Sequence, residues 1–280
     1  MKKLILVLIL TFLFIELTAA QSLKVMTYNI RLDLASDKDN AWNNRKDFFI
    51  SQMKFYEPDI FGVQEALPNQ INDLTANLPA YSHIGIGRDE GGKGEASAIF
   101  FKRNRFKVSG ENTFWLSETP EKSSKSWDAA YPRICTFGLF KDLKTKKTFR
   151  VFNTHLDHVG EVARTRGIEM ILAKIRAVNT KDYPVFFMGD FNSEPDTERI
   201  KNLKKAMTDS RDASESEPFG PSGSFNGFKF NEPVTRLIDY IFIDNSKRIR
   251  IKKYAVLSDS MNLHFPSDHF PIFVEAEIGK

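Results

Sequence analysis

The chain has 280 residues, of which 41% are hydrophobic, enough for one large α/β or sandwich core. Its single cysteine, Cys135, excludes an internal disulfide, so the packed core alone must stabilise the fold. A net charge of +4 at pH 7 allows an anionic substrate but identifies none.

Residues 1–20 have the pattern of a secretory signal peptide. Two lysines precede an apolar run over residues 4–15, and small residues that suit cleavage precede Gln21. The run is short for a bilayer span and Glu16 follows it, which disfavours a retained membrane anchor. We therefore expect an exported protein, periplasmic or secreted, whose mature domain covers residues 21–280 and contains no membrane span.

The first half of the mature chain alternates predicted strands with predicted helices. Short apolar runs and alternating apolar residues indicate strands, and apolar residues at helical spacing near prolines indicate helices. Between two strands, the glycine-rich residues 88–95 are expected to form a flexible loop. The expected strands cover residues 23–28, 60–63, 81–87 and 98–101, and the expected helices cover residues 42–56 and begin again at Pro68.

The second half repeats the alternation around one buried strand. Residues 185–188 are an apolar run that leads through Gly189 to Asp190 and Asn192. A hairpin and a helix are expected before this strand, and a helix follows it. Residues 210–230 lack an apolar period and are expected to form a long surface loop. The other expected strands cover residues 134–140, 149–154, 237–243, 249–256 and 271–278, and the helices cover residues 162–179 and 200–207.

Eight polar side chains lie at predicted strand ends or just past them. Taken singly, each has an ordinary structural explanation of about equal weight, such as starting a turn or capping a helix. Taken together, their oxygen atoms suit a hard cation such as Mg²⁺, whereas zinc would require more histidine or cysteine. Two histidines beside carboxylates also suit acid–base chemistry. The eight residues are Asn29, Glu65, His155, Asp190, Asn192, Asp239, Asp268 and His269.

Seven short motifs follow one another along nearly the whole mature chain, over residues 23–277. They are MTYNIR, DIFGVQE, SAIFFKR, NTHLD, MGDFNSEP, LIDYIF and PSDHFPI. This ordered set closely resembles the endonuclease/exonuclease/phosphatase superfamily, and the shared order is far more specific than any single motif. The resemblance implies a four-layer α/β sandwich, in which two mixed sheets pack face to face with helices outside.

The resemblance also implies roles for residues that match the family motifs. Glu65 is expected to be the principal metal ligand, with Asn29 close to metal and phosphate and Asp268 near a metal. Asp190 and Asn192 are expected to orient the attacking water and to hold the phosphate. The implied cofactor is Mg²⁺, for which Mn²⁺ can substitute.

The remaining expected site residues surround the two histidines. By resemblance, His269 is the essential histidine and Asp239 supports it, while His155 faces the phosphate. Glu95 stands where deoxyribonucleases place a glutamate beside that second histidine. Arg133 and Arg164 are candidate phosphate contacts, with a solvated surface arginine an equal alternative for each.

Two departures from the family's motifs reduce the range of expected substrates. Arg31 stands where abasic-site enzymes carry an acid, so a second acidic ligand is absent there. The tryptophan and arginine signatures of inositol polyphosphate 5-phosphatases are missing.

Four aromatic residues could stack on bases or sugars, although packing between sheet and loop is the slightly favoured explanation. These are Phe114, Trp115, Trp127 and Tyr131.

The sequence thus predicts Mg²⁺-dependent hydrolysis of a phosphoester by metal-assisted attack of water. A phosphodiester is the first expectation, as in a nuclease, and a phosphomonoester or a phospholipid headgroup is the alternative. A non-catalytic binding module would have lost ligands, and none is lost here. Nucleic acid is allowed as a partner but not indicated, because the basic run at residues 247–253 fits an amphipathic edge strand. We expect a monomer.

Overall fold

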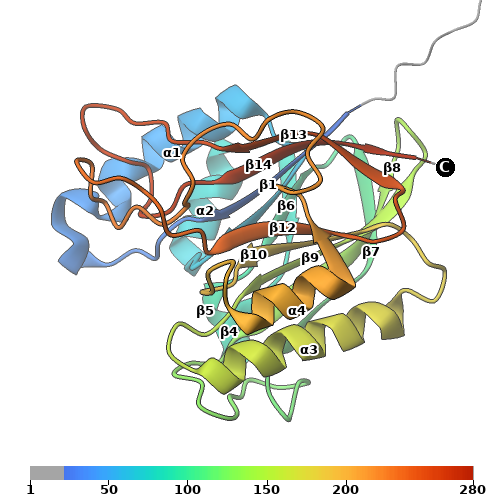
Figure 1. The fold of residues 1–280 in the computed structure, drawn as a ribbon. Helices are drawn as coiled ribbons and strands as arrows, with labels where there is room; N and C mark the ends of the chain where they lie inside the picture. The colour runs from blue at the N-terminus through green and yellow to red at the C-terminus, as the bar shows by residue number, and fades with distance from the viewer. Residues whose placement is uncertain (1–21, 280) are drawn as a thin grey trace, which may run out of the picture.

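Two six-stranded mixed sheets pack face to face, and helices cover both outer faces (Figure 1). This computed structural model describes residues 22–279, so the predicted signal peptide at residues 1–20 lies outside the described residues. The four-layer α/β sandwich expected from the sequence is confirmed. Within residues 22–279, no helix combines the length and the hydropathy needed to cross a membrane.

The first sheet carries the N- and C-terminal strands at its centre. Strand β1 pairs in parallel with β2 and antiparallel with β14, and the β1–β2 register sets Asn29 opposite Gln64. The two strands therefore end together at one edge of the sandwich. In spatial order, the strands are β13 (Ile249–Val256), β14 (Ile272–Ile278), β1 (Leu23–Asn29), β2 (Ile60–Gln64), β6 (Ile99–Lys102) and β3 (Tyr81–Ile84).

The second sheet is organised around the buried strand at Val185–Asp190. This strand, β10, pairs in parallel with β9 and antiparallel with β12, which sets Asp190 opposite both His155 and Asp239. Chain topology alone thus brings three expected site residues to one edge. In spatial order, the strands are β11 (Met207–Asp209), β12 (Asp239–Asp244), β10 (Val185–Asp190), β9 (Thr148–His155), β8 (Ile134–Asp142) and β7 (Phe106–Trp115).

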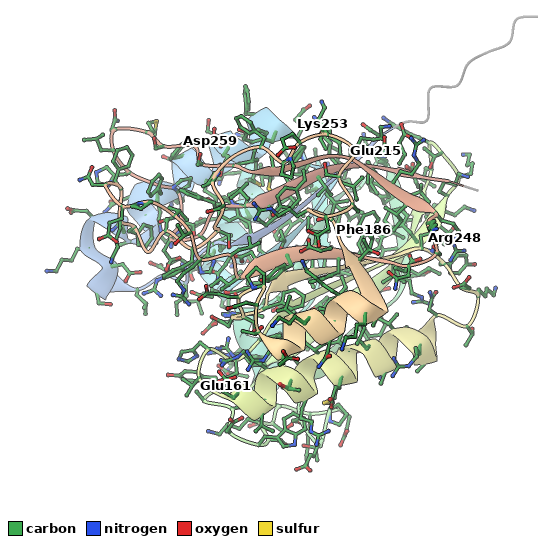
Figure 2. The ribbon with its side chains drawn as sticks, in the orientation of Figure 1. Glu161, Phe186, Glu215, Arg248, Lys253 and Asp259 are labelled. Carbon is green, nitrogen blue, oxygen red and sulfur yellow. The ribbon has the colours of Figure 1, made fainter. Side chains whose placement is uncertain are left out.

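Aromatic residues fill the space between the sheets and under the helices. Phe101 on the first sheet meets Phe140 on the second edge-to-face, with ring centroids 5.6 Å apart. Phe186 is fully buried in the same core (Figure 2). Complete burial of such a side chain contributes about 1.5–3 kcal/mol. The core therefore supplies the stability that disulfides cannot.

Two helices cover each sheet. Helix α1 (Trp42–Tyr56) buries Trp42, Phe49 and Met53 against the first sheet and ends at the left-handed Glu57, just before Pro58. Helix α2 (Pro68–Asn77) begins on its proline, as predicted, and joins that layer. Helices α3 (Glu161–Val178) and α4 (Glu198–Ala206) cover the second sheet. Two 3-10 turns are η1 (Ala35–Asn40) and η2 (Glu90–Gly92).

A polar contact joins the two sheets just behind the site. Gln64 Nε2 donates to Asn153 Oδ1 at 2.7 Å, and Asn153 Nδ2 donates to the carbonyls of Val63 and Ala98. Gly62 permits this approach, because a Cβ there would lie 2.7 Å from the Asn153 side chain. The strand ends that carry the site are thus fixed across the sandwich.

Three segments differ from the expectations. The predicted flexible loop at residues 88–95 forms a two-stranded sheet of β4 (Gly87–Asp89) and β5 (Lys93–Ala96), whose turn uses glycines with positive φ. Strands β7 and β11 were not predicted. The loop at residues 210–230 was predicted correctly, but it bridges to β13 and reaches His269.

Loops near the site are tied down by buried polar groups. Arg45 on α1 donates to the carbonyls of Ile30, Arg31 and Pro266, which places the two loops that follow β1 and precede β14. Asp259, labelled in Figure 2, accepts hydrogen bonds from Gln52 and Tyr56 of the same helix. Helix α1 therefore positions the loop after β1 and the segment that leads to Asp268.

Candidate active site

Asp190 lies between the two expected site histidines. Its Oδ2 atom is 3.5 Å from His155 Nε2 and 3.8 Å from His269 Nε2. Burial raises the pKa of Asp190, and the nearby Asp239 carboxylate raises it further. A buried carboxylate with a raised pKa is a stronger proton acceptor than a solvated one.

His269 and Asp239 form a buried pair beside Asp190. His269 Nδ1 donates to Asp239 Oδ2 at 2.8 Å. Burial alone would lower the pKa of His269, but the carboxylates of Asp239, Asp190 and Asp268 outweigh it and raise that pKa to about 10. The imidazole is therefore protonated at neutral pH and directs Nε2–H toward Asp190.

His155 has the opposite protonation. Burial lowers its pKa well below the ordinary value, and the charges of Arg133 and Arg88 lower it further. Asn192 Nδ2 lies 3.1 Å from His155 Nε2 and donates to the Leu156 carbonyl at 3.0 Å. With the Asn192 amide as donor, His155 is a neutral imidazole that carries its proton on Nδ1.

The turn after β10 aims Asn192 at the site. The Asn192 N–H donates to Asp190 Oδ1 at 2.8 Å, and Asn192 has a left-handed backbone with φ of 45°. The pair therefore forms the turn that was the structural alternative, and this turn also orients the Asn192 amide toward His155. Glu65 also has a positive φ, 62°, at the end of β2, a conformation that is commonly stored at functional sites.

Asn29 bridges the two sheets at the site. Its Nδ2 atom donates to Glu65 Oε1 at 3.1 Å and to Asp190 Oδ2 at 3.0 Å, while its Oδ1 accepts the Arg31 N–H at 3.0 Å. In this arrangement Asn29 orients two carboxylates, and its Oδ1 keeps a second lone pair that could contact a cation.

The carboxylates present an oxygen-rich set that fits a hard cation. Asp190, Asp239 and His269 have ligand atoms within 4.8 Å of one another, which is consistent with a metal site, but the His269–Asp239 hydrogen bond accounts for much of this closeness. Glu65 and Asp268 are the two acidic metal ligands expected from the sequence. Burial raises the pKa of Asp268; His269 opposes this, while the Glu65 carboxylate adds to it, so a cation between the two carboxylates would relieve their repulsion.

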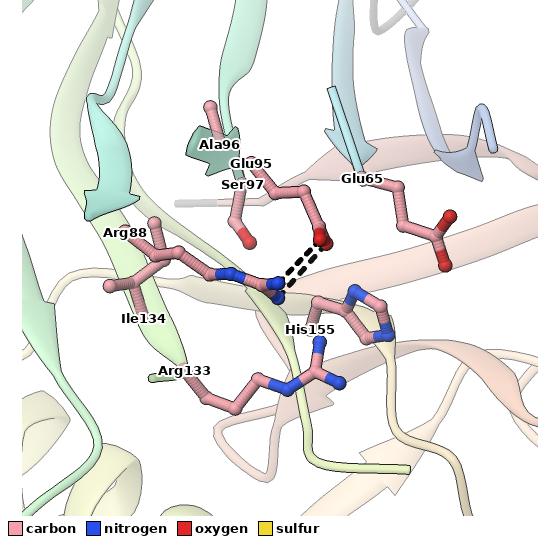
Figure 3. Close-up of a pocket in the computed structure, with 8 residues that line it drawn as sticks. All are labelled: Glu65, Arg88, Glu95, Ala96, Ser97, Arg133, Ile134 and His155. Carbon is pink, nitrogen blue, oxygen red and sulfur yellow. Dashed lines mark hydrogen bonds and ion pairs between the residues drawn. The ribbon is translucent and has the colours of Figure 1, made fainter. Parts of the chain in front are cut away.

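A small pocket opens beside His155 (Figure 3). Its enclosed volume is about 10 Å³, room for one water-sized group. Arg88 and Glu95 face each other across it in a bidentate ion pair, with nitrogen–oxygen distances of 2.5 and 3.0 Å. The pocket is lined by Glu65, Arg88, Glu95, Ala96, Ser97, Arg133, Ile134 and His155.

Of the three peripheral residues expected near the phosphate, two line this pocket and one does not. Arg133 lines the pocket, although its Nε pairs with Asp157 at 3.2 Å. Glu95 lines the same pocket, but its carboxylate pairs with Arg88, and no hydrogen bond joins it to His155 among the described residues. Arg164 does not line this pocket. It donates to the Asp157 carbonyl at 2.9 Å and pairs with Glu161, which braces the turn after β9.

Two site residues were missed by sequence reasoning. Ser224 donates to Asp239 Oδ2 at 2.6 Å from within the long loop, and Arg88 supplies a wall of the pocket. No periodicity or motif marks either residue, because each belongs to a segment predicted only as a loop. The eight residues expected at strand ends, by contrast, all converge on one edge of the sandwich.

Carboxylates and histidines gathered at one edge of the sandwich suit acid–base and metal-assisted hydrolysis of a phosphoester. The chain belongs to the Endonuclease/Exonuclease/phosphatase family, whose model matches residues 26–269. It is accordingly an enzyme, a phosphoester hydrolase of this family.

The solved structures most useful for comparison come from Bacteroides thetaiotaomicron. An endonuclease/exonuclease/phosphatase family protein from this organism is 36% identical, with a TM-score of 0.87, and the match covers 93% of this chain and 99% of that one. Its mannosyl-6-phosphatase is also 36% identical, with a TM-score of 0.86, over 91% of this chain and 99% of that one.

A relative found by sequence comparison is named as a nuclease and not as a phosphatase. The probable RNA exonuclease of Saccharomyces cerevisiae is 25% identical over 194 residues, which is 62% of this chain and 38% of that protein.

Proposed function

We propose that this enzyme is a Mg²⁺-dependent phosphomonoesterase that releases phosphate from an uncharged, hydroxyl-bearing alcohol. The carrying observation is the likeness to a mannosyl-6-phosphatase, which is 36% identical to this chain over 91% of its length. The Arg88–Glu95 ion pair in the pocket beside His155 offers such an alcohol one hydrogen-bond donor and one acceptor.

The residues on the buried side would activate water. A water beside Asp190 would lose its proton to this carboxylate, whose raised pKa favours that transfer. The protonated His269, oriented by Asp239, would donate to a phosphate oxygen as charge develops there. Asn192 would keep His155 oriented toward the phosphate, because its amide N–H groups contact His155 Nε2 and the Leu156 carbonyl. These residues act on the phosphate itself and would serve a monoester or a diester.

The leaving oxygen would depart on the pocket side. In-line displacement sets it opposite the attacking water, and His155 and Glu65 line that side. Mg²⁺ bound by Glu65 and Asp268 would neutralise phosphate charge and stabilise the leaving alkoxide. The neutral His155 would hold a phosphate oxygen through Nδ1–H.

The proposal is tested with three substrates in Mg²⁺ and in EDTA: mannose 6-phosphate, ethyl phosphate and a dinucleoside monophosphate. We expect Mg²⁺-dependent phosphate release from both monoesters, with kcat/KM for mannose 6-phosphate roughly a hundredfold above that for the diester. Chromatography of the products measures both reactions. A preference for the diester would overturn the proposal.

Phosphodiester hydrolysis is the second candidate. The resemblance to a probable RNA exonuclease favours it, although the match covers 38% of that protein. The dinucleoside monophosphate in the panel tests it directly, and an RNA oligonucleotide extends the test to longer strands.

We also propose that the enzyme is exported and acts outside the cytoplasm. The lysines, apolar run and small residues at positions 1–20 support this location. Expression of the full chain in a bacterium, followed by N-terminal sequencing of the periplasmic product, should give a start at Gln21. Retention of Met1 in a cytoplasmic product would contradict it.

A further inference from the structure

We propose that Arg88, Glu95 and Tyr131 form a leaving-group subsite and that this subsite takes a pyranose ring with free hydroxyls. The inference rests on the proposed phosphomonoesterase function. In Figure 3 the Arg88 guanidinium and the Glu95 carboxylate meet in the pocket whose far side is formed by His155 and Glu65. A group attached to the leaving oxygen therefore reaches this pair first.

The Arg88–Glu95 pair is matched to a hydroxyl group. A hydroxyl can donate to Glu95 and accept from Arg88 at the same time. Because the pair balances its own charges, it offers a second phosphate, a carboxylate or an ammonium no net charge to bind. The pocket holds one water-sized group, so a single hydroxyl fits inside while the ring that carries it stays at the rim.

The pair is held rigidly, as a specificity element requires. The Arg88 carbonyl accepts hydrogen bonds from Trp115 Nε1 at 2.6 Å and from Ser123 Oγ at 2.9 Å. Both side chains of the pair are more than four-fifths buried. Donor and acceptor are thus fixed before substrate arrives, which lowers the entropy cost of binding.

Tyr131 supplies the contact for the ring. Its side chain is 50% exposed, although its ring centroid lies 4.9 Å from the Arg88 guanidinium and 5.8 Å from the nearly parallel His158 ring. Arg133 Nη2 in turn contacts His158 Nδ1 at 3.0 Å. Tyr131 is therefore braced from within while half of it faces solvent at the pocket rim. An exposed aromatic surface with a phenol hydroxyl suits the mixed C–H and hydroxyl faces of a sugar.

A purely structural role is the competing explanation. The ion pair joins the two short strands of the β4–β5 hairpin, so it could serve only to hold that hairpin closed. In that case the pair would support every substrate equally. A subsite, by contrast, acts only on substrates that carry the ring and its hydroxyls.

The experiment compares mannose 6-phosphate with ethyl phosphate, which has neither ring nor free hydroxyl. For Tyr131→Ala, we expect KM for mannose 6-phosphate to rise about five- to tenfold with little change in kcat, because an aromatic contact is lost. For Glu95→Gln, kcat/KM for mannose 6-phosphate should fall roughly tenfold or more, because a hydroxyl partner is altered. In both variants the ratio of kcat/KM for mannose 6-phosphate to kcat/KM for ethyl phosphate should fall.

Phe55→Ala is the matched control, because Phe55 is a 79% exposed aromatic residue on α1. It should change KM and kcat for neither substrate. Equal losses on both substrates, or an unchanged KM for mannose 6-phosphate in Tyr131→Ala, would overturn the subsite. A wild-type enzyme that cleaves the dinucleoside monophosphate but neither monoester would instead contradict the proposed function, and the subsite proposal would fall with it.

Discussion

The two sides of the phosphate site are built in different ways. On the water side, Asp190, Asp239 and His269 come from ends of β-strands or the residues just before one, and each is at most 4% exposed. On the leaving-group side, Arg88 and Glu95 come from a two-stranded hairpin, and the half-exposed Tyr131 comes from a loop. In our proposal, the sandwich therefore fixes the chemistry, while the hairpin and the loop select the alcohol.

The charges of the two sides differ as well. The water side gathers carboxylates around one protonated histidine, so its negative charge is incompletely balanced without a cation. The leaving-group side pairs its charges internally, through Arg88 with Glu95 and Arg133 with Asp157. Substitutions on the water side should consequently reduce the hydrolysis of every substrate. Substitutions on the leaving-group side should reduce mainly the hydrolysis of substrates that carry a ring with hydroxyls.

Asp190→Asn gives the largest expected effect. We expect kcat to fall about a thousandfold on mannose 6-phosphate and on ethyl phosphate alike, because the amide cannot accept the proton of water. Steady-state kinetics on both substrates measures the loss, and thermal unfolding checks that the variant is folded. Loss of less than tenfold, or loss on one substrate only, would break the distinction between the two sides.

Glu65→Gln should act through the cation. We expect the Mg²⁺ concentration for half-maximal activity to rise by roughly a hundredfold, with activity largely recovered at saturating Mg²⁺. A Mg²⁺ titration of the reaction rate checks this, and EDTA should abolish activity in the parent. Glu169→Gln, at a 56% exposed glutamate on α3, is the control. An unchanged titration curve would remove Glu65 from the metal site.

Asp157→Asn tests whether the Asp157 carboxylate holds the segment that carries Tyr131 in place. Asp157 accepts N–H groups of Ala130, Tyr131, Val159 and Gly160 and pairs with Arg133. We expect a loss of about 2–3 kcal/mol of unfolding free energy at pH 7, because a charged acceptor becomes neutral. KM for mannose 6-phosphate should also rise as Tyr131 loses its support.

The pH dependence of that loss follows from the pKa of Asp157. Burial acts to raise this pKa, but the N–H donors and Arg133 outweigh it and lower the pKa. The carboxylate therefore stabilises the fold above about pH 4, the unfolded value, and this stabilisation disappears as pH falls toward the lower folded value. Urea unfolding at several pH values should show the parent and the variant converging in acid. Asp47→Asn, on the exposed face of α1, should show no such pattern.

The polar residues at strand ends could be predicted from the sequence because the signals that mark them are local. The apolar run before Asp190 marks a buried strand, and the polar residue after such a strand must lie at a sheet edge. Helices α1 and α2 were likewise marked by spacing and by prolines. The motif order then identified which strand ends meet, a long-range fact that periodicity alone does not contain.

The missed elements lack such signals. Strand β7 has mostly exposed residues in its middle and a register shift between Ser109 and Asn112, so no clean alternation survives. Residues 88–95 were predicted to be flexible because three of the eight are glycines. Those glycines instead adopt the positive φ values that close the β4–β5 hairpin. Side chains on such segments acquire partners only through tertiary contacts, as Glu95 does with Arg88.

Ser224→Ala gives the smallest expected effect and tests the boundary between the two sides. Ser224 lies in the long loop, yet its fully buried hydroxyl bonds Asp239 on the water side. Loss of this donor leaves Asp239 with His269 as its remaining side-chain partner, so kcat should fall about three- to tenfold. The decrease should be equal on mannose 6-phosphate and ethyl phosphate, and the exposed Ser222→Ala should change neither. A decrease confined to mannose 6-phosphate would instead assign this loop to selection of the alcohol.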